Sequence, residues 1–264
     1  MIAGPPPLPL ALPDAVRQLA GDGNAHPVWQ NEVGGTTFEV AGATGHRFIK
    51  WSPSSSGIDL AAEVARLRWA VDYAAVPRVL GHGRNSEGQW LVTAALPGTS
   101  AVAPRWIADP RAAVTALGRA LRSLHDTLPV ASCPFDWSAE TRIEDATLRA
   151  EQLNPAAWPK EFTGLSVAQA LRRVADPPPL DRLVVCHGDA CAPNTLLHDD
   201  GRLAGHVDLG TLGVADRWAD LAVITWSTEW NYGADWTDAL LDAYGVQRDQ
   251  ARIDYYRLLW NLGP

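Results

Sequence analysis

The sequence predicts an α+β fold, with a β-rich N-terminal third followed by a mainly helical remainder. Short apolar and β-branched runs separated by glycine turns occupy residues 27–96. After the breaker pair Pro97 and Gly98, the apolar residues recur at helical spacing instead. We therefore expect two lobes, residues 1–96 and 97–264, and a chain of 264 residues has enough apolar content for both.

The N-terminal lobe is predicted to be a small antiparallel sheet with one helix. We expect strands over residues 27–33, 37–42, 46–52, 76–83 and 88–96. Residues 57–73 carry apolar side chains at Leu60, Val64, Leu67 and Val71, which is the spacing of one helix face. The helix thus lies between the third and fourth predicted strands.

The C-terminal lobe shows helical signals on both sides of a short strand-forming stretch. Asp109 and Pro110 form a helix start, and Val114, Leu117 and Leu121 continue it as an apolar stripe. We expect short hairpin-like strands over residues 182–188 and 203–210, and closing helices over 217–230 and 236–262. Helices thus predominate after residue 97.

Composition limits the classes of partner and the setting. The net charge of −8 argues against nucleic acid and is compatible with a cationic small molecule. Three cysteines without metal-ligand spacing indicate reduced thiols and a cytoplasmic location. Residues 1–16 are apolar but rich in proline and lack a basic start, which predicts an extended arm rather than a signal peptide. No apolar run reaches the roughly eighteen residues of a membrane span, and both monomer and homodimer stay open.

Three polar residues at fixed offsets lie between the predicted C-terminal strands. Asp189 and Asn194 are five positions apart, and Asp208 follows a hairpin. Each alone is an ordinary turn former. Together they supply a carboxylate for an attacking hydroxyl, which is the role we predict for Asp189, and oxygen ligands for Mg²⁺, the role of Asn194 and Asp208.

A lysine and a glutamate in the N-terminal lobe complete this pattern. Lys50 ends a predicted strand, and Glu63, thirteen residues later, lies on the apolar stripe of the predicted helix. A buried carboxylate is unfavourable without a partner, so we expect Glu63 to pair with Lys50 and aim its ammonium at nucleotide phosphates. The turn at Gly34, Gly35 and Thr36 precedes both and can offer backbone N–H groups to phosphates.

The segments "VVCHGDACAPNTLL", "GHVDLGTLGVADRWADLA" and "SLHDTLPVASCPFDW" resemble the aminoglycoside phosphotransferases, nearest their 3′-phosphotransferase branch. The similarity is strong from Leu121 to Asp220 and looser over Lys50, Glu63 and "WLVTAALPG". It implies a bilobal protein-kinase-like fold that uses ATP and Mg²⁺. The N-terminal lobe would bind the nucleotide, and the C-terminal lobe would hold the catalytic and substrate-binding groups.

The resemblance also implies roles at matching positions. Asp189 resembles the catalytic aspartate, and Asn194 and Asp208 resemble the metal ligands. Lys50, positioned by Glu63, resembles the lysine on the α- and β-phosphates. The resemblance further implies an adenine-binding hinge from Thr93 to Ala95, a structural loop histidine at His187, and a helix carboxylate at Asp220 that braces the loop.

The acceptor-binding segments depart from the family pattern. Most of the acids that read aminoglycoside ammonium groups are absent, while tryptophans stand in the matching segments. The candidate acceptor-binding residues are Trp158, Glu161, Trp226, Glu229, Trp230 and Trp260. Indoles in a cleft favour stacking on sugar or peptide planes, but large aromatics also pack helices together.

The leading hypothesis is an ATP- and Mg²⁺-dependent O-phosphotransferase that inactivates an antibiotic, most simply an aminoglycoside. A kinase of a cyclic-peptide antibiotic of the capreomycin or viomycin type is one alternative, and a kinase of a metabolic alcohol such as choline is another. A catalytically silent nucleotide-binding module is the third, although the set of Lys50, Asp189, Asn194 and Asp208 argues against it.

Overall fold

The computed structural model describes residues 6, 10–31, 33–42 and 45–263 of the chain. The chain forms two compact units, Met1–Leu96 and Pro97–Pro264. The first is built on an antiparallel sheet and the second is mainly helical, as the sequence predicts. Among the described helices, none combines the length and the apolar character that a membrane crossing requires.

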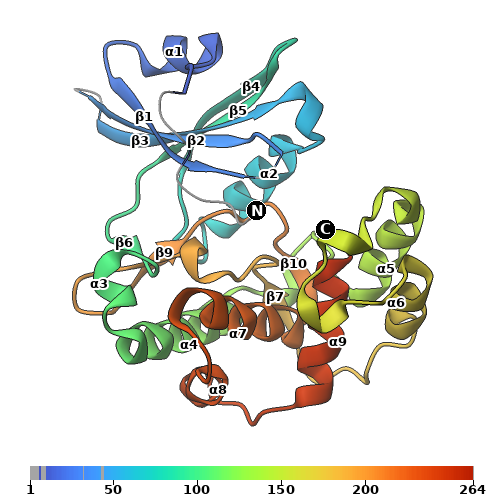
Figure 1. Cartoon of the computed structure of the whole chain (residues 1–264). Helices are drawn as coiled ribbons and strands as arrows, with labels where there is room; N and C mark the ends of the chain where they lie inside the picture. Colours follow the sequence, from blue (N-terminus) through green and yellow to red (C-terminus); the bar gives the residue numbers. More distant parts are fainter. Residues whose placement is uncertain (1–5, 7–9, 32, 43–44, 264) are drawn as a thin grey trace. The chain divides into compact units, whose positions relative to one another are not determined.

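The first unit contains a five-stranded antiparallel sheet in the order β1-β2-β3-β5-β4 (Figure 1). The strands are β1 (Asn24–Gln30), β2 (Thr36–Gly42), β3 (Gly45–Pro53), β4 (Val79–Arg84) and β5 (Gly88–Ala94). The five strands predicted from the sequence are therefore confirmed, with ends shifted by a few residues. The central strand β3 carries Lys50, which lies opposite Thr37 of β2 and Leu91 of β5.

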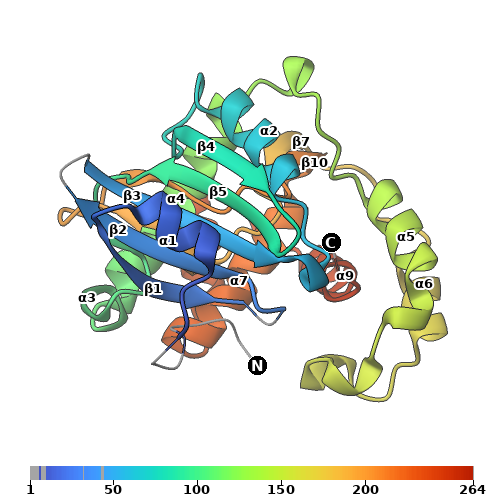
Figure 2. The ribbon, with the colours of Figure 1, turned by 90° about the horizontal axis from the view of Figure 1, so that it is seen from above.

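Two helices pack on this sheet, one against β4 and β5 and the other against β1 and β3. The helix α2 (Leu60–Ala70) begins at Asp59, whose side chain accepts a hydrogen bond from the backbone N–H of Ala61 at 3.0 Å, and it packs against β4 and β5. The helix α1 (Asp14–Ala20) lies over β1 and β3 and buries Val16 in their core (Figure 2).

The expectation of an extended arm over residues 1–16 is wrong for residues 14–16, which belong to α1. Pro13 immediately before the helix fixes φ at −56°, and Asp14 places a carboxylate in the first turn. Burial of apolar side chains on the sheet stabilises this short helix, which propensity alone does not predict. Residues 1–5 and 7–9 of the predicted arm lie outside the described residues.

The second unit is a group of packed helices. They are α3 (Pro104–Ile107), α4 (Pro110–Thr127), α5 (Ala139–Leu148), α6 (Val167–Val174), α7 (Trp218–Tyr232), α8 (Thr237–Tyr244) and α9 (Gln250–Asn261). The predicted start of α4 is confirmed, because the Asp109 side chain accepts from the N–H of Ala112 at 3.2 Å and Pro110 opens the helix. Helix α4 packs on α8, and α7 packs on both α8 and α9. Helix α5 lies beside α6 (Figures 1 and 2).

Short strands inside the second unit position its polar loops. One sheet has the order β6-β8-β9, with β6 (Thr99–Ser100), β8 (Thr195–Leu197) and β9 (Leu203–His206). The other pairs β7 (Leu183–Cys186) with β10 (Gly213–Asp216). The two predicted apolar runs are thus strands, but each pairs with a different neighbour, and β10 was not predicted.

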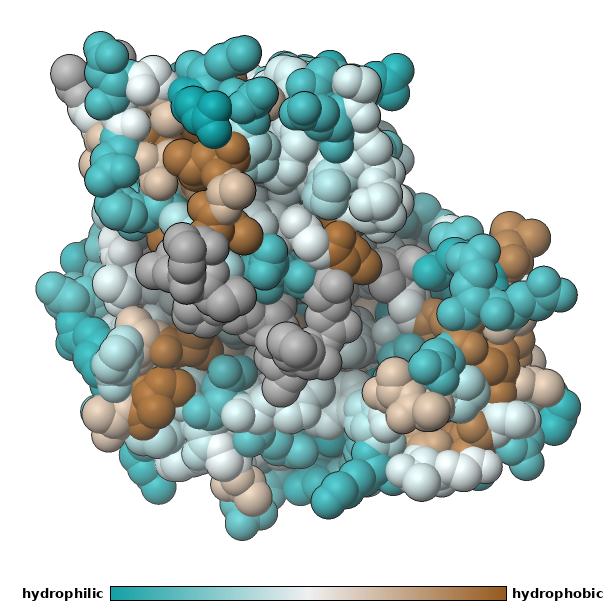
Figure 3. Space-filling view, turned by 45° about the horizontal axis from the view of Figure 1, so that its top comes forward, coloured by the Kyte–Doolittle hydropathy of each residue, from teal (hydrophilic) through white to brown (hydrophobic). Residues whose placement is uncertain are grey.

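The face in Figure 3 is mostly hydrophilic, and its apolar residues gather in separate groups. Exposed large apolar side chains in the described residues include Leu148, Leu180 and Leu183, which belong to different segments. Scattered exposure of this kind is ordinary for a folded protein and does not indicate a docking surface.

Candidate active site

The buried strand β7 delivers the loop that contains Asp189. The strand ends at Cys186, and the loop continues through His187, Gly188 and Asp189. Gly188 has φ of +85°, and a Cβ atom there would lie 2.3 Å from the carbonyl oxygen of Thr211. Only glycine fits this position, so the backbone of the HGD motif can turn sharply against the neighbouring segment.

Asp220 on α7 holds the backbone of this loop. Its Oδ2 accepts the N–H of His187 at 2.6 Å, and its Oδ1 accepts the N–H of Gly188 at 2.9 Å. Asp220 is fully buried, and burial alone would raise its pKa. Hydrogen bonds from His125 and from the loop outweigh burial and hold the pKa below its ordinary value. A permanently ionised carboxylate therefore fixes the loop.

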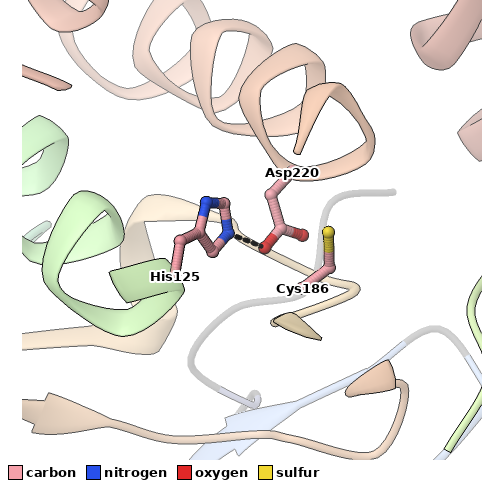
Figure 4. A group of neighbouring side chains, drawn as sticks. All are labelled: His125, Cys186 and Asp220. Atoms are coloured by element: carbon pink, nitrogen blue, oxygen red, sulfur yellow. Dashed lines mark hydrogen bonds and ion pairs between the residues drawn. The ribbon is translucent and has the colours of Figure 1, made fainter. Parts of the chain in front are cut away.

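His125 on α4 completes this brace, as Figure 4 shows. Its Nε2 lies 3.0 Å from Asp220 Oδ2, and its Nδ1 lies 2.9 Å from the hydroxyl of Tyr244. Because Asp220 is ionised, His125 Nε2 donates to it, while Nδ1 is hydrogen-bonded to the Tyr244 hydroxyl. Helices α4, α7 and α8 are thus joined behind the loop.

His125, Cys186 and Asp220 place their potential metal-ligand atoms within 4.8 Å of one another (Figure 4). The geometry nevertheless favours a brace over a metal site. The His125 nitrogen and the Asp220 oxygen are hydrogen-bonded to each other, and the Cys186 thiol donates to Asp216 O at 3.4 Å. Burial and nearby carboxylates raise the pKa of the Cys186 thiol well above its usual range, so it stays protonated.

His187 connects the Asp189 loop to the segment that carries Asp208. Its Nε2 donates to the carbonyl oxygen of Val207 at 3.0 Å, and its Nδ1 accepts the N–H of Asp189 at 3.4 Å. The imidazole is buried and stacks edge-on with His206 at a centroid distance of 5.8 Å. These contacts place His187 inside the protein, where it orients its neighbours.

Asn194 orients the carboxylate of Asp189. The Asn194 side-chain N–H₂ donates to Asp189 O and to Asp189 Oδ2, both at 3.0 Å. The other carboxylate oxygen, Oδ1, is buried and accepts no hydrogen bond from any residue in the described part of the chain. Burial raises the pKa of Asp189, and the negative charge of Asp208 raises it further.

Asp208 reaches the same loop through the β8–β9 hairpin. The N–H of Val207 donates to the carbonyl oxygen of Asn194 at 2.9 Å, which holds the two ends of the hairpin together. Asp208 has φ of +63°, a left-handed conformation that is uncommon outside glycine. The charge of Asp208 acts on the pKa of Asp189, so the two carboxylates lie near each other. The carboxylate of Asp208 and the amide oxygen of Asn194 are donors of the type that Mg²⁺ prefers.

In the first unit, the expected ion pair is present. Lys50 Nζ lies 2.9 and 2.7 Å from the two carboxylate oxygens of Glu63. The Glu63 side chain is 7% exposed and that of Lys50 is 26% exposed. The buried carboxylate of Glu63 is therefore held by the cation of Lys50, the pairing that the sequence predicts.

The glycine turn folds on its own asparagine. Asn31 Oδ1 accepts the N–H groups of Val33 at 3.2 Å and Gly35 at 2.6 Å, and Asn31 O accepts that of Gly34 at 3.3 Å. Thr36 is buried at the start of β2, where its hydroxyl accepts from Gln30 Nε2 at 3.2 Å. The N–H groups expected to meet phosphates are thus already engaged.

The expected hinge is likewise engaged with its own sheet. Thr93 lies opposite Phe48 and Val79 within the strands. The N–H of Ala94 donates to Arg78 O at 2.9 Å, and that of Ala95 donates to His46 O at 3.1 Å. Adenine recognition by the Ala95 N–H therefore requires release of an existing hydrogen bond.

Three of the four candidate tryptophans form one cluster in the second unit. The ring centroid of Trp226 lies 4.9 Å from that of Trp230 and 6.0 Å from that of Trp260, and Trp230 and Trp260 are 6.1 Å apart. Trp226 is only 4% exposed and Trp230 is 41% exposed. Trp230 is thus the accessible ring of the cluster, and Trp226 packs beneath it. The fourth candidate, Trp158, takes part in none of the ring contacts among the described residues.

The two candidate acids meet at Arg257, which sequence reasoning missed. Arg257 Nη2 lies 2.7 Å from Glu229 Oε1, and Nη1 lies 3.9 Å from Glu161 Oε2. The only signal in the sequence is an arginine inside the apolar run "YYRLLW". Its partners are distant along the chain, so spacing does not predict them.

Comparison with known proteins agrees with this geometry. The family model described as "Phosphotransferase enzyme family" matches residues 31–256. An aminoglycoside 3′-phosphotransferase of Streptomyces fradiae is 36% identical over 227 residues, covering 79% of this chain and 81% of the relative. A streptomycin 3″-kinase of Streptomyces griseus is 36% identical over 248 residues, covering 87% and 88%.

Solved structures show the same relationship. An aminoglycoside-3′-phosphotransferase of type VIII superposes with a TM-score of 0.82 at 30% identity, over 94% of this chain and 97% of that one. An aminoglycoside phosphotransferase of Streptomyces rimosus in complex with ADP and streptomycin gives 0.74 at 30% identity, over 93% and 95%. The chain therefore belongs to the phosphotransferase enzyme family and has the protein-kinase-like fold of its aminoglycoside phosphotransferases.

Proposed function

We propose that the protein transfers the γ-phosphoryl group of ATP to a hydroxyl of an aminoglycoside and thereby inactivates it. The observation that carries this proposal is the state of Asp189, whose Oδ2 is fixed by Asn194 while its buried Oδ1 accepts no bond from a described residue. The carboxylate of Asp189 would orient the acceptor hydroxyl and receive its proton. Positioning by such a carboxylate is a major part of phosphoryl-transfer catalysis.

Asn194 and Asp208 would hold Mg²⁺, and Lys50, positioned by Glu63, would contact the nucleotide phosphates. When bound, the ion and the ammonium neutralise charge on the phosphates. The donors fit these roles. The amide N–H₂ of Asn194 is bound to Asp189, so its oxygen is the atom that can face a cation, and Lys50 is fixed by both carboxylate oxygens of Glu63.

The choice of acceptor rests on charge and on the relatives. A net charge of −8 suits a polycation, and the relatives include both 3′-phosphotransferases and a streptomycin 3″-kinase. We propose the 3′-hydroxyl as the first site to test, with the 3″-hydroxyl of streptomycin as the comparison.

A turnover screen tests this proposal. ATP consumption is measured with Mg²⁺ and each of neomycin, kanamycin, streptomycin, viomycin and choline, and the product is mapped by ³¹P and ¹H NMR. We expect a phosphorylated aminoglycoside. Transfer to viomycin or choline alone, or no transfer to any acceptor, contradicts the proposal.

A further inference from the structure

Arg257 on α9 lies at the meeting point of three residues that we expect to read the acceptor. Its guanidinium bridges Glu229 at 2.7 Å and Glu161 at 3.9 Å, and its Cζ lies 5.4 Å from the ring centroid of Trp226. The guanidinium side chain is 8% exposed, whereas those of Glu161 and Glu229 are 39% and 36% exposed. A single buried cation thus lies behind two accessible carboxylates.

The orientation of Arg257 is fixed by α7. Its Nε donates to the carbonyl oxygen of Ala222 at 3.4 Å, and its Nη2 donates to the hydroxyl of Thr225 at 3.2 Å. A planar guanidinium held at several atoms and stacked on an indole cannot turn away from the acids. Its charge is therefore a permanent part of this surface.

The net charge of this triplet is low for a surface that reads a polycation. Two carboxylates and one guanidinium leave a net charge of −1. Burial raises the pKa of Glu161, Arg257 opposes that rise, and Glu229 and Asp254 add to it. Arg257 thus favours the ionised form of Glu161 against the effect of burial, and its positive charge weakens the attraction of the two acids for a second cation.

Glu229, one of the two acids that pair with Arg257, lies on α7, the helix that braces the catalytic loop. On α7, Ser227 Oγ accepts the N–H of Ala192 at 2.9 Å, two residues before Asn194. Glu229 and Trp230 follow Ser227 within one helical turn. Glu229 is therefore two residues from a direct contact between α7 and the loop that carries Asp189 and Asn194.

We infer that Arg257 sets the charge preference of the acceptor site, which takes an aminoglycoside ring with one ammonium group in preference to one with several. Trp230 offers its exposed indole face to the ring, and Glu161 and Glu229 share the remaining negative charge. This inference rests on the proposed function, since it names the acceptor class of the same site. A variant without the Arg257 charge should favour acceptors that carry an additional ammonium group.

Binding of a matched ligand pair tests the inference. Neomycin and paromomycin differ by an amino group in place of a hydroxyl, and calorimetry gives both Kd values for the wild type and for Arg257→Gln. We expect the wild type to bind paromomycin about 3-fold more tightly than neomycin, and Arg257→Gln to bind neomycin about 3-fold more tightly than paromomycin, a change of about 10-fold in the ratio of Kd values. An unchanged ratio, or failure of the wild type to bind either ligand, overturns the inference.

Matched variants separate a charge effect from a loss of structure. Arg257→Lys restores a cation and should return the ratio toward the wild-type value. Arg252→Gln removes another α9 arginine, which pairs with Asp216 and Asp249, and should leave the ratio unchanged. If Arg257→Gln does not fold, the exposed Glu161→Gln variant should shift the preference toward paromomycin, and an unshifted ratio contradicts the inference.

The transfer assay and the binding assay fail separately. Absence of phosphoryl transfer to every aminoglycoside contradicts the proposed function even if the Kd ratio shifts. An unshifted Kd ratio with normal transfer contradicts only the role of Arg257.

Discussion

The loop around Asp189 and the turn around Gly34 are both predicted to serve phosphoryl transfer, yet their backbone groups are held in different ways. The N–H groups of His187 and Gly188 are bound by Asp220, more than thirty residues away on α7. The N–H groups of the glycine turn are bound by Asn31, within four residues. The first loop is therefore preorganised by the tertiary fold, whereas the described N–H groups of the second are held by local hydrogen bonds.

Loss of the Asp220 charge should have the largest effect, because the loop depends on it. In the wild type, both carboxylate oxygens of Asp220 accept buried N–H groups, and in Asp220→Asn an N–H₂ group replaces one of these oxygens. The variant should therefore lose about 3 kcal/mol of stability and unfold roughly 6–12 °C lower. Turnover should fall at least about 10-fold. Differential scanning calorimetry and steady-state kinetics measure both.

Asp242→Asn is the matched control, since Asp242 is exposed on α8. It should behave as the wild type. Wild-type turnover in Asp220→Asn would show that the loop does not need the brace.

Lys50 lies between these two cases, because its partner Glu63 is thirteen residues away, on a different element of the same unit. In Lys50→Met, the buried carboxylate of Glu63 loses its cation, which should lower the free energy of unfolding by about 2–3 kcal/mol. This is less than the cost of breaking a fully buried ion pair, because the Lys50 side chain is 26% exposed. Nucleotide affinity should fall as well. Urea unfolding and nucleotide titration measure the two effects.

The double variant Lys50→Met with Glu63→Gln removes the orphaned charge. It should regain most of the stability but none of the nucleotide affinity. Recovery of nucleotide affinity in the double variant would contradict a phosphate-binding role for Lys50.

Asn31→Ala should have the smallest effect. It removes the acceptor that competes with phosphate for two N–H groups, so KM for ATP should fall by about 2-fold while stability drops by about 1 kcal/mol. Asn85→Ala is the matched control, because Asn85 Oδ1 accepts the N–H groups of Glu87 and Gly88 at 2.9 and 3.1 Å in another hairpin of the same sheet. A large rise of KM for ATP in Asn31→Ala alone would mean that Asn31 itself contacts the nucleotide.

Two kinds of feature could be predicted from the sequence. They are secondary-structure elements with a clear local pattern, and a buried charged residue that requires a partner of opposite charge. Periodicity placed the strands and α2, and the position of Glu63 on an apolar stripe required a cation such as Lys50. The helix α1 was missed because its stability comes from packing on the sheet. The strand β10 was missed because four residues are too short to show alternation.

Contacts between distant segments escaped prediction for the same reason. Arg257 joins two acids on other elements, and His125 reaches Asp220 from a helix 95 residues earlier. Nothing in the spacing of these residues indicates that they meet. The reaction is thus readable from a contiguous motif, while acceptor preference depends on packing between helices.

The most direct test of the central claim is single-turnover transfer by Asp189→Asn with ATP, Mg²⁺ and the best aminoglycoside acceptor. The substitution keeps the shape of the side chain and removes the proton-accepting charge at Oδ1. We predict a rate about 10²–10⁴-fold below wild type with unchanged nucleotide affinity. A rate within a few-fold of wild type would contradict the assignment of Asp189 as the residue that orients and deprotonates the acceptor.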